Sequence, residues 1–230
     1  VKYIPVKSYR AAVSAFRNNQ VQLAWFGGLS GVQARRLVPG SKAIAQGYED
    51  QYFKTLIIAN DNTGLKKAKT LPKNVSHLSF TFGSKGSTSG RLMPEFYLQQ
   101  FYADTSQNTF KHVGFSGDHS RTIALVQTGA YDLGAVNFKV WEQALLDPKN
   151  DLSRVKVIWE TPHYPDYQWT IRGDADTYWG EGFSEKVKQT LLNIDQPKLL
   201  QAFPRSKFVS ANTSDYTVIL ETAQTIGLID

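Results

Sequence analysis

Short, nearly unbroken apolar runs alternate along the chain with amphipathic segments, and this alternation constrains the fold more than any other feature. Val21–Phe26 (VQLAWF) follows a segment in which Ala12, Val13 and Phe16 recur at helical spacing. Leu56–Ala59 (LIIA) is another short apolar run. Because continuous apolar strands beside amphipathic helices are typical of a parallel sheet covered on both faces, the pattern predicts the α/β class.

The remaining elements follow from the same periodicity and from the turn residues between them. Further strands are predicted at Val1–Val6, His77–Phe82, Phe110–Phe115, Tyr131–Val136 and Val155–Trp159. Helices are predicted after Ser8 and over Ser30–Leu37, Ser87–Tyr102, the residues from Gly117 to Gln127, Ser184–Leu192 and Ser214–Ile226. The segments Ser8–Phe26 and His119–Phe138 share a helix, a polar turn and a short apolar strand in that order, which favours two lobes of related design.

Composition excludes several classes of protein for these 230 residues. No apolar run reaches the roughly 18–20 residues that cross a bilayer. The absence of cysteine excludes disulfides, thiolate metal sites and a cysteine nucleophile. A net charge of +6 favours anionic partners. The basic residues are scattered, with only Lys66, Lys67 and Lys69 grouped in one polar stretch, so no nucleic acid is expected as a partner.

The stretch from Ser79 to Tyr102 carries the most chemical information. A predicted strand runs into a glycine-rich loop, and the helix that follows begins with Ser87, Thr88 and Ser89. Hydroxyl residues at a helix start can simply cap its backbone N–H groups. Three consecutive hydroxyls are more than a cap needs, and the N-terminus of a helix attracts an oxyanion. The sequence therefore favours an anion site here, with a plain cap as the alternative.

Two enzyme motifs fail at the same place. The run GSKGSTSG lacks the Gly-Lys-Ser/Thr ending of a nucleotide-binding P-loop. The run GSTSG has the spacing of a nucleophile elbow only with Thr88 at its centre, where a serine is expected. A hydrolase would also need a base and an orienting acid, for which His119 and Asp118 are the candidates.

Histidines and tyrosines supply the other candidates. His119 opens a second predicted helix, where it is either a surface residue or a donor to an anion. The other histidines are dispersed, so no metal site is expected. Tyr9, Tyr52 and Tyr167 lie in polar loops, and a tyrosine at a site wall offers an apolar face and one O–H donor. Packing at the base of a loop is the alternative for each.

Three stretches together resemble the phosphonate-binding proteins of bacterial ABC importers. They are Ala24–Arg35 (AWFGGLSGVQAR), Gly86–Pro94 (GSTSGRLMP) and Gly117–Asn137 (GDHSRTIALVQTGAYDLGAVN), and the match covers Val1 to about Trp169. The resemblance implies a type II periplasmic binding protein with two α/β lobes, a two-stranded hinge and a ligand cleft between the lobes. In such a receptor the Ser-Thr-Ser run holds the phosphonate oxygens. The ligand-binding residues implied are Ser87, Thr88, Ser89, Tyr9, Tyr52, His119 and Tyr167.

The ligand class follows from departures from the family pattern. Binders of aminoalkyl phosphonates resemble one another in carrying two carboxylates for the amine of the ligand. The first is missing in Val136–Trp141 (VNFKVW), and Asp166 or Tyr167 stands near the second. The resemblance therefore implies a smaller or apolar-tailed oxyanion such as phosphite, methylphosphonate or phosphate. The stretches Gly27–Arg35 and Ala43–Asp50 also resemble a sister branch thought to handle selenate-like anions, so a selenate or sulfonate receptor is an alternative.

The resemblance sets the remaining expectations. Lobe one should comprise residues 1–73 and 163–230, without the strand and helix with which the family begins, and lobe two residues 74–162. A monomeric receptor is expected, with no catalytic activity, no cofactor and no metal. It should deliver its anion to an ABC permease from the periplasm, with the signal peptide absent from this chain. A ligand-sensing domain of the same fold and, less favoured, a hydrolase are the rival functions.

Overall fold

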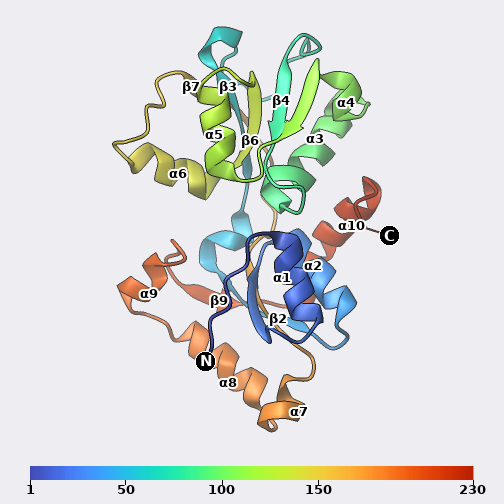
Figure 1. Cartoon of the computed structure of the whole chain (residues 1–230), viewed down its shortest axis with the longest axis vertical. Helices are drawn as coiled ribbons and strands as arrows, with labels where there is room; N and C mark the ends of the chain where they lie inside the picture. Colours follow the sequence, from blue (N-terminus) through green and yellow to red (C-terminus); the bar gives the residue numbers. More distant parts are fainter. Residues whose placement is uncertain (230) are drawn as a thin grey trace. The chain divides into compact units, whose positions relative to one another are not determined.

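The computed structural model describes residues 1–229, which divide into two compact units joined by two chain crossings. Unit 1 holds residues 1–53 and 164–229, and unit 2 holds residues 54–163. Each unit builds its own sheet and covers it with its own helices (Figure 1). The α/β class predicted from the alternation is therefore confirmed.

Unit 2 is built on a five-stranded sheet in the order β5-β4-β6-β3-β7. Its strands are β3 (Thr55–Asn60), β4 (Ser79–Phe82), β5 (His112–Phe115), β6 (Leu133–Asn137) and β7 (Val155–Glu160). Its helices are α3 (Met93–Tyr102), α4 (Ser106–Thr109), α5 (His119–Gln127) and α6 (Phe138–Leu146), with short turns η2 (Asp61–Thr63) and η3 (Thr88–Leu92). Strand β4 pairs in parallel with β5 and β6, whereas β3 is antiparallel to both β6 and β7.

Strand β3 shows how the two faces of this sheet are filled. Ile57 lies in a hydrophobic cluster with Leu98 of α3, whereas Leu56 and Ile58 lie in a second cluster with Ile123 of α5. Successive side chains of a strand point to opposite faces, so a strand buried on both faces must be apolar at every position. This explains the unbroken run LIIA, and it leaves the ends of the strands to present the polar groups.

Unit 1 is built on a four-stranded sheet in the order β1-β8-β2-β9, in which all paired strands are antiparallel. Its strands are β1 (Leu23–Phe26), β2 (Lys42–Gly47), β8 (Gln168–Ile171) and β9 (Phe208–Ser210). Its helices are α1 (Tyr9–Arg17), α2 (Gly28–Leu37), α7 (Ala175–Trp179), α8 (Phe183–Leu192), α9 (Pro197–Gln201) and α10 (Thr217–Thr225), with short turns η1 (Tyr48–Tyr52) and η4 (Thr213–Tyr216). One core cluster joins Phe16 and Phe26 to α2, and another joins Ile44 and Ile171 to Leu191 of α8.

Two sequence expectations about the strands are wrong. Val1–Val6 forms no strand: Val1, Tyr3 and Val6 are exposed, and no neighbouring strand pairs with this segment among the described residues. The expected fully parallel sheet is also wrong, because only β5, β4 and β6 pair in parallel. An antiparallel strand buried on both faces is as continuously apolar as a parallel one, so periodicity could not separate the two cases.

The first division between the units lies earlier in the chain than the predicted one, and the second lies one residue later. Residues 54–73, which the sequence assigned to lobe one, lie in unit 2, and so does His163. Strand β3 lies in this segment, and its pairing with β6 and β7 ties the segment to the unit 2 sheet. Residue 230, which the predicted lobe one includes, lies outside the described residues. Among residues 1–229, no helix has the length and apolar character needed to span a membrane.

Candidate functional site

The glycine-rich loop after β4 leads into an unusual helix start. Ser87 is the N-cap, and its Oγ accepts a hydrogen bond of 2.9 Å from the backbone N–H of Gly90. The first turn, Thr88–Leu92, is a π-helical turn in which the N–H of Leu92 donates to the carbonyl of Ser87 at 3.0 Å. π-Turns are rare and frequently lie at functional sites, because they change where the helix start directs its side chains and N–H groups.

The three hydroxyl residues of this turn are all withdrawn from the surface. Ser87, Thr88 and Ser89 are 1%, 2% and 1% exposed. Capping occupies the Oγ of Ser87 as an acceptor, so its O–H remains a donor. The capping alternative thus accounts for one of the three hydroxyls, and the burial of the other two exceeds what a cap requires.

His119 joins this turn from the start of α5. Its Nε2 lies 3.4 Å from Ser89 Oγ, and its Nδ1 accepts a hydrogen bond of 3.3 Å from the backbone N–H of Asn137. Burial lowers the pKa of His119 from 6.5 to about 4, against the opposing effect of Asp118. The ring is therefore neutral at pH 7, and because Nδ1 is the acceptor, the proton lies on Nε2 and points at Ser89.

Gly90 is required here for packing. A Cβ added to it would lie 3.0 Å from both His119 Cε1 and Ser87 Oγ, and 3.2 Å from the Cα of Gly83. Gly83 donates its N–H to the carbonyl of Gly90 at 2.8 Å, so the loop and the turn touch backbone to backbone. Protein atoms therefore surround the position that a side chain at residue 90 would occupy.

Unit 1 brings together two of its three candidate tyrosines. The hydroxyls of Tyr9 and Tyr167 lie 3.2 Å apart, and the ring of Tyr167 stacks on Trp25 with centroids 5.7 Å apart and an interplanar angle of 17°. Burial raises the pKa of Tyr167 well above its usual value, and Tyr9 adds to the rise, so its hydroxyl stays protonated. Tyr52 packs edge-on against Tyr48 and keeps 55% of its surface exposed.

A buried ion pair that the sequence did not reveal packs against these aromatic rings. Arg205 donates two hydrogen bonds to the carboxylate of Asp50, from Nε to Oδ2 at 2.6 Å and from Nη2 to Oδ1 at 2.7 Å. The guanidinium lies over the rings of Trp25 and Tyr167 with its Cζ 5.9 and 5.5 Å from their centroids. Residues 155 apart in the chain form this pair, so no local sequence pattern could have revealed it.

Asp166 also has a defined structural task. Its carboxylate is 1% exposed, and Oδ1 accepts a hydrogen bond of 2.8 Å from the backbone N–H of Gly28, at the start of α2. A carboxylate at this place satisfies a helix N–H and lies at the positive end of the helix dipole. The acidic side chain next to Tyr167 is therefore engaged within unit 1.

The hydrolase alternative lacks its base. Asp118 caps α5 by accepting the N–H of Arg121 at 2.8 Å, so it does not orient His119. The partner of His119 Nδ1 is a backbone donor, which places the ring proton on Nε2 facing Ser89. A protonated Nε2 cannot accept the hydroxyl proton of Ser89, and the general-base step of a hydrolase needs that transfer. The arrangement is suited to donating hydrogen bonds.

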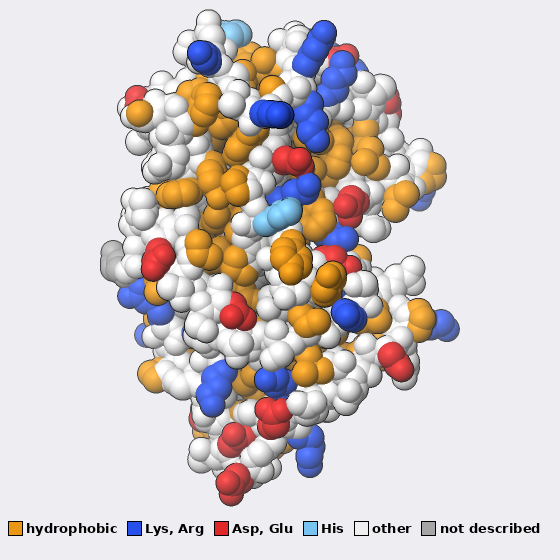
Figure 2. Space-filling view, turned by 180° about the vertical axis from the view of Figure 1, so that it is seen from behind, with side chains coloured by type: hydrophobic (Ala, Val, Ile, Leu, Met, Phe, Trp, Pro, Cys, Tyr) orange, Lys and Arg blue, Asp and Glu red, His pale blue; other side chains and the backbone are white. Residues whose placement is uncertain are grey.

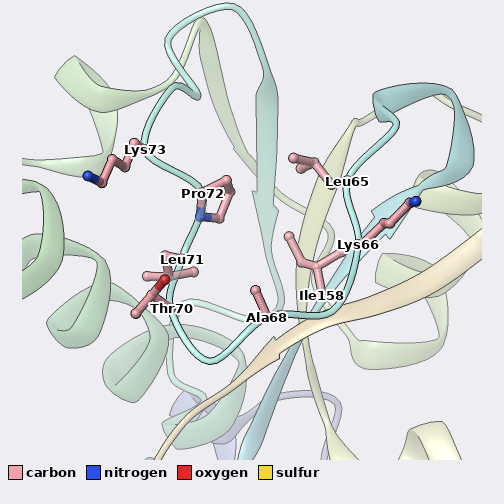
Figure 3. Close-up of a pocket in the computed structure, with 8 residues that line it drawn as sticks. All are labelled: Leu65, Lys66, Ala68, Thr70, Leu71, Pro72, Lys73 and Ile158. Atoms are coloured by element: carbon pink, nitrogen blue, oxygen red, sulfur yellow. The ribbon is translucent and has the colours of Figure 1, made fainter.

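A surface hollow elsewhere in unit 2 has a different character. Figure 3 shows Leu65, Ala68 and Ile158 facing the hollow between two limbs of the loop after β3, whereas Lys66 and Lys73 extend outward. Figure 2 shows hydrophobic side chains interspersed with Lys and Arg on one face of the molecule. The lining of the hollow in Figure 3 is mainly aliphatic and does not suit a bare anion, which needs converging hydrogen-bond donors. The Ser87–Ser89 turn remains the candidate site of this unit.

The paired α/β units, joined by two chain crossings and carrying hydroxyls at a helix start, define a type II periplasmic binding protein. Comparison with known families agrees: the family described as "ABC transporter, phosphonate, periplasmic substrate-binding protein" matches residues 1–216. The chain belongs to this family of phosphonate-binding proteins, which are solute receptors and not enzymes.

Individual relatives support the assignment. The chain is 42% identical to the "probable ABC transporter phosphite binding protein PhnD1" of Prochlorococcus marinus (strain MIT 9301), over 100% of this chain and 80% of the relative. A solved structure of PhnD1 from Prochlorococcus marinus in complex with methylphosphonate superposes with a TM-score of 0.93 at 43% identity, covering 100% of this chain and 87% of that one.

A more distant relative is the phosphonates-binding periplasmic protein of Escherichia coli (strain K12). It is 26% identical over 81% of this chain and 53% of its own length. Family membership makes the chain an extracytoplasmic receptor for a small phosphonate-type oxyanion that works with the membrane components of an ABC transporter.

Proposed function

We propose that this receptor binds phosphite or methylphosphonate through the hydroxyls of Ser87, Thr88 and Ser89 and the Nε2–H of His119. The observation that carries the proposal is the burial of three adjacent hydroxyls at one helix start, with a neutral histidine directed at the third. Hydrogen bonds to a charged acceptor are about twice as strong as neutral ones, and a dry setting strengthens them further.

Neutral donors suit this task better than lysine or arginine would. A neutral site compensates the charge of the anion through dipoles and hydrogen bonds, so no ion pair has to be broken when the anion leaves. The π-turn adds the partial positive charge of a helix start without adding a full charge. Reversible capture is what a transport receptor needs.

Tyr9, Tyr52 and Tyr167 are the unit 1 residues that we propose contact the ligand. The protonated hydroxyl of Tyr167 lies beside that of Tyr9, so this pair offers both a donor and an aromatic surface. Stacking on Trp25 and the overlying guanidinium of Arg205 hold the Tyr167 ring in place. Tyr52 is more exposed and would gain contacts on binding.

The shortage of carboxylates supports a ligand without an amine. An ammonium group needs a carboxylate partner, and the stretch Val136–Trp141 carries none, while Oδ1 of Asp166 already accepts the N–H of Gly28. The relative that is 42% identical is named for phosphite, and the related solved structure holds methylphosphonate. Both ligands are small and carry no amine. Phosphate, selenate and sulfonates are the alternatives that a screen must compare with them.

Thermal-shift measurements with a panel of oxyanions test the ligand class. A ligand that binds only the folded state raises the melting temperature, by an amount that grows with its concentration relative to Kd. Phosphite and methylphosphonate should give the largest shifts, and 2-aminoethylphosphonate a smaller one. A larger shift with selenate or an alkanesulfonate would assign the receptor to the alternative class.

Calorimetric titration of Thr88→Ala tests the residues. Removing one donor to a charged ligand typically costs about 1.5–3 kcal/mol, so the affinity for methylphosphonate should fall roughly tenfold or more. Thr81→Ala is the matched control, since Thr81 is also buried but donates to the carbonyl of Phe82 within β4. Equal affinities of Thr88→Ala and the unaltered protein would reject the proposed site.

We infer that the receptor acts as a monomer, since each unit completes a hydrophobic core on both faces of its own sheet. Light scattering should give the mass of one chain, 25.8 kDa, with and without ligand. A mass near twice that value would show a dimer.

A further inference from the structure

The π-turn leaves one backbone carbonyl without a helical partner. In this turn each carbonyl accepts from the fifth residue ahead: Ser87 from Leu92, and Thr88 from Met93. Ser89 would take its hydrogen bond from residue 94 in the same pattern, but Pro94 has no N–H. The N–H of Met93, which would serve Ser89 in an α-helix, already donates to Thr88. The carbonyl of Ser89 therefore needs a hydrogen-bond donor from outside the turn.

Thr55 supplies that donor. Its Oγ1 donates a hydrogen bond of 2.8 Å to the carbonyl of Ser89, and the side chain is 0% exposed. A buried carbonyl left without a hydrogen bond is destabilising, so the contact fixes where the Ser89–Gly90 peptide can lie. The side chains of Thr88 and Ser89 project from the same turn, and their direction follows the orientation of its peptides.

Thr55 is itself held firmly by a second threonine. Its N–H donates to Thr161 Oγ1 at 3.0 Å, and its carbonyl accepts from the N–H of Thr161 at 3.0 Å. On its other side Thr55 pairs with Asn137 in the register of β3 and β6, and the N–H of Asn137 orients the ring of His119. The Ser89 peptide and the His119 ring, the two parts of the proposed anion site, are thus both held through contacts that involve Thr55 or its strand partner Asn137.

This residue also lies next to the place where the chain passes between the units. Unit 2 begins at Lys54 and ends at His163, one residue before Thr55 and two residues after Thr161. The adjoining unit 1 residues, Phe53 and Tyr164, exchange backbone hydrogen bonds of 3.0 and 2.9 Å. Hydrogen bonds therefore join the two crossing segments on both sides of the boundary between the units, between Thr55 and Thr161 and between Phe53 and Tyr164.

We propose that Thr55 is a positioning residue of the anion site: its hydroxyl holds the Ser89 peptide so that the Thr88 and Ser89 hydroxyls face the ligand. The inference rests on the proposed function of the turn and extends it to a residue outside the glycine-rich loop.

The test compares Thr55→Val, which removes only the hydroxyl, with Thr55→Ser, which restores it, and with Thr81→Val as a buried control in the same sheet. Two quantities are measured: the Kd for methylphosphonate by calorimetry, and hydrogen exchange of the backbone of residues 84–93 in the ligand-free protein. Should Thr55→Val fail to fold, Thr55→Cys takes its place, since a thiol has similar size and is a weak donor.

Thr55→Val should bind methylphosphonate roughly tenfold more weakly, the factor that corresponds to about 1.4 kcal/mol. Exchange in residues 84–93 should be faster than in the unaltered protein. Thr55→Ser should bind within about threefold of the unaltered protein, and Thr81→Val should match it even where its stability falls. Unchanged exchange in Thr55→Val, or faster exchange with unchanged affinity, would overturn the proposal. If Thr55→Val and Thr88→Ala both bind methylphosphonate normally, the proposed anion site itself is wrong. If Thr88→Ala binds weakly and Thr55→Val binds normally, only the proposed role of Thr55 is wrong.

Discussion

The protonation of His119 offers a quantitative check on the geometry of the site. Burial places the pKa of this residue at about 4 in the folded protein, below its ordinary value of 6.5. The unfolded chain therefore takes up a proton first as the pH falls. When the pKa of a histidine is lower in the folded than in the unfolded state, the free energy of unfolding is highest above pH 6.5 and decreases progressively as the pH falls towards 4. Each pKa unit corresponds to about 1.4 kcal/mol, so the loss at pH 4.5 should be about 2–3 kcal/mol.

The assay is urea denaturation of the ligand-free protein and of His119→Asn at pH 7.5 and pH 4.5. Asparagine does not titrate, and its amide oxygen can still accept the N–H of Asn137, so other titrating groups affect both proteins alike. The stability difference between the two proteins should shift by about 2–3 kcal/mol towards the variant at pH 4.5. A difference that stays constant between the two pH values would show that His119 keeps its ordinary pKa in the folded protein, and would contradict its burial against Ser89.

Two further predictions concern residues that support the site. Asp50→Asn leaves the guanidinium of Arg205 buried without a charged partner and should lower the free energy of unfolding by about 3–5 kcal/mol in urea denaturation; a loss below about 1 kcal/mol would contradict a tightly paired buried ion. Gly90→Ala places a methyl group 3.0 Å from His119 Cε1 and Ser87 Oγ, so it should displace both and weaken methylphosphonate binding in calorimetry. Normal affinity of that variant would show that the turn can shift without affecting the ligand.

The elements with local signals were predictable from the sequence. Ser8 does cap the first helix, accepting the N–H of Ala11, and the apolar periodicity placed α1, α5 and α8 within a few residues. Local capping and spacing preferences fix such elements before any tertiary contact forms. The resemblance to phosphonate-binding proteins implied that Ser87–Ser89 and His119 share a site, and His119 Nε2 lies 3.4 Å from Ser89 Oγ in the structure.

What the sequence did not reveal depends on contacts between distant residues. The residues after Ser87 were predicted as part of one helix over Ser87–Tyr102, whereas the structure has a π-helical turn at Thr88–Leu92, a form for which helical spacing gives no signal. Thr55 lies 34 residues before Ser89 in the sequence, so no local pattern connects the two residues. Pro94, which has no N–H, was the only local sign that a carbonyl of the turn would need another donor. Strand β2 was missed because Lys42–Gly47 has small and polar residues where a strand usually has branched ones.

A crystal structure of the complex with methylphosphonate would test the central claim most directly. The account predicts phosphonate oxygens about 2.5–3.0 Å from the hydroxyl oxygens of Ser87, Thr88 and Ser89, with His119 Nε2 within hydrogen-bond distance of the anion or of Ser89. A phosphonate bound elsewhere on the chain, with these three hydroxyls still enclosed by protein alone, would contradict it.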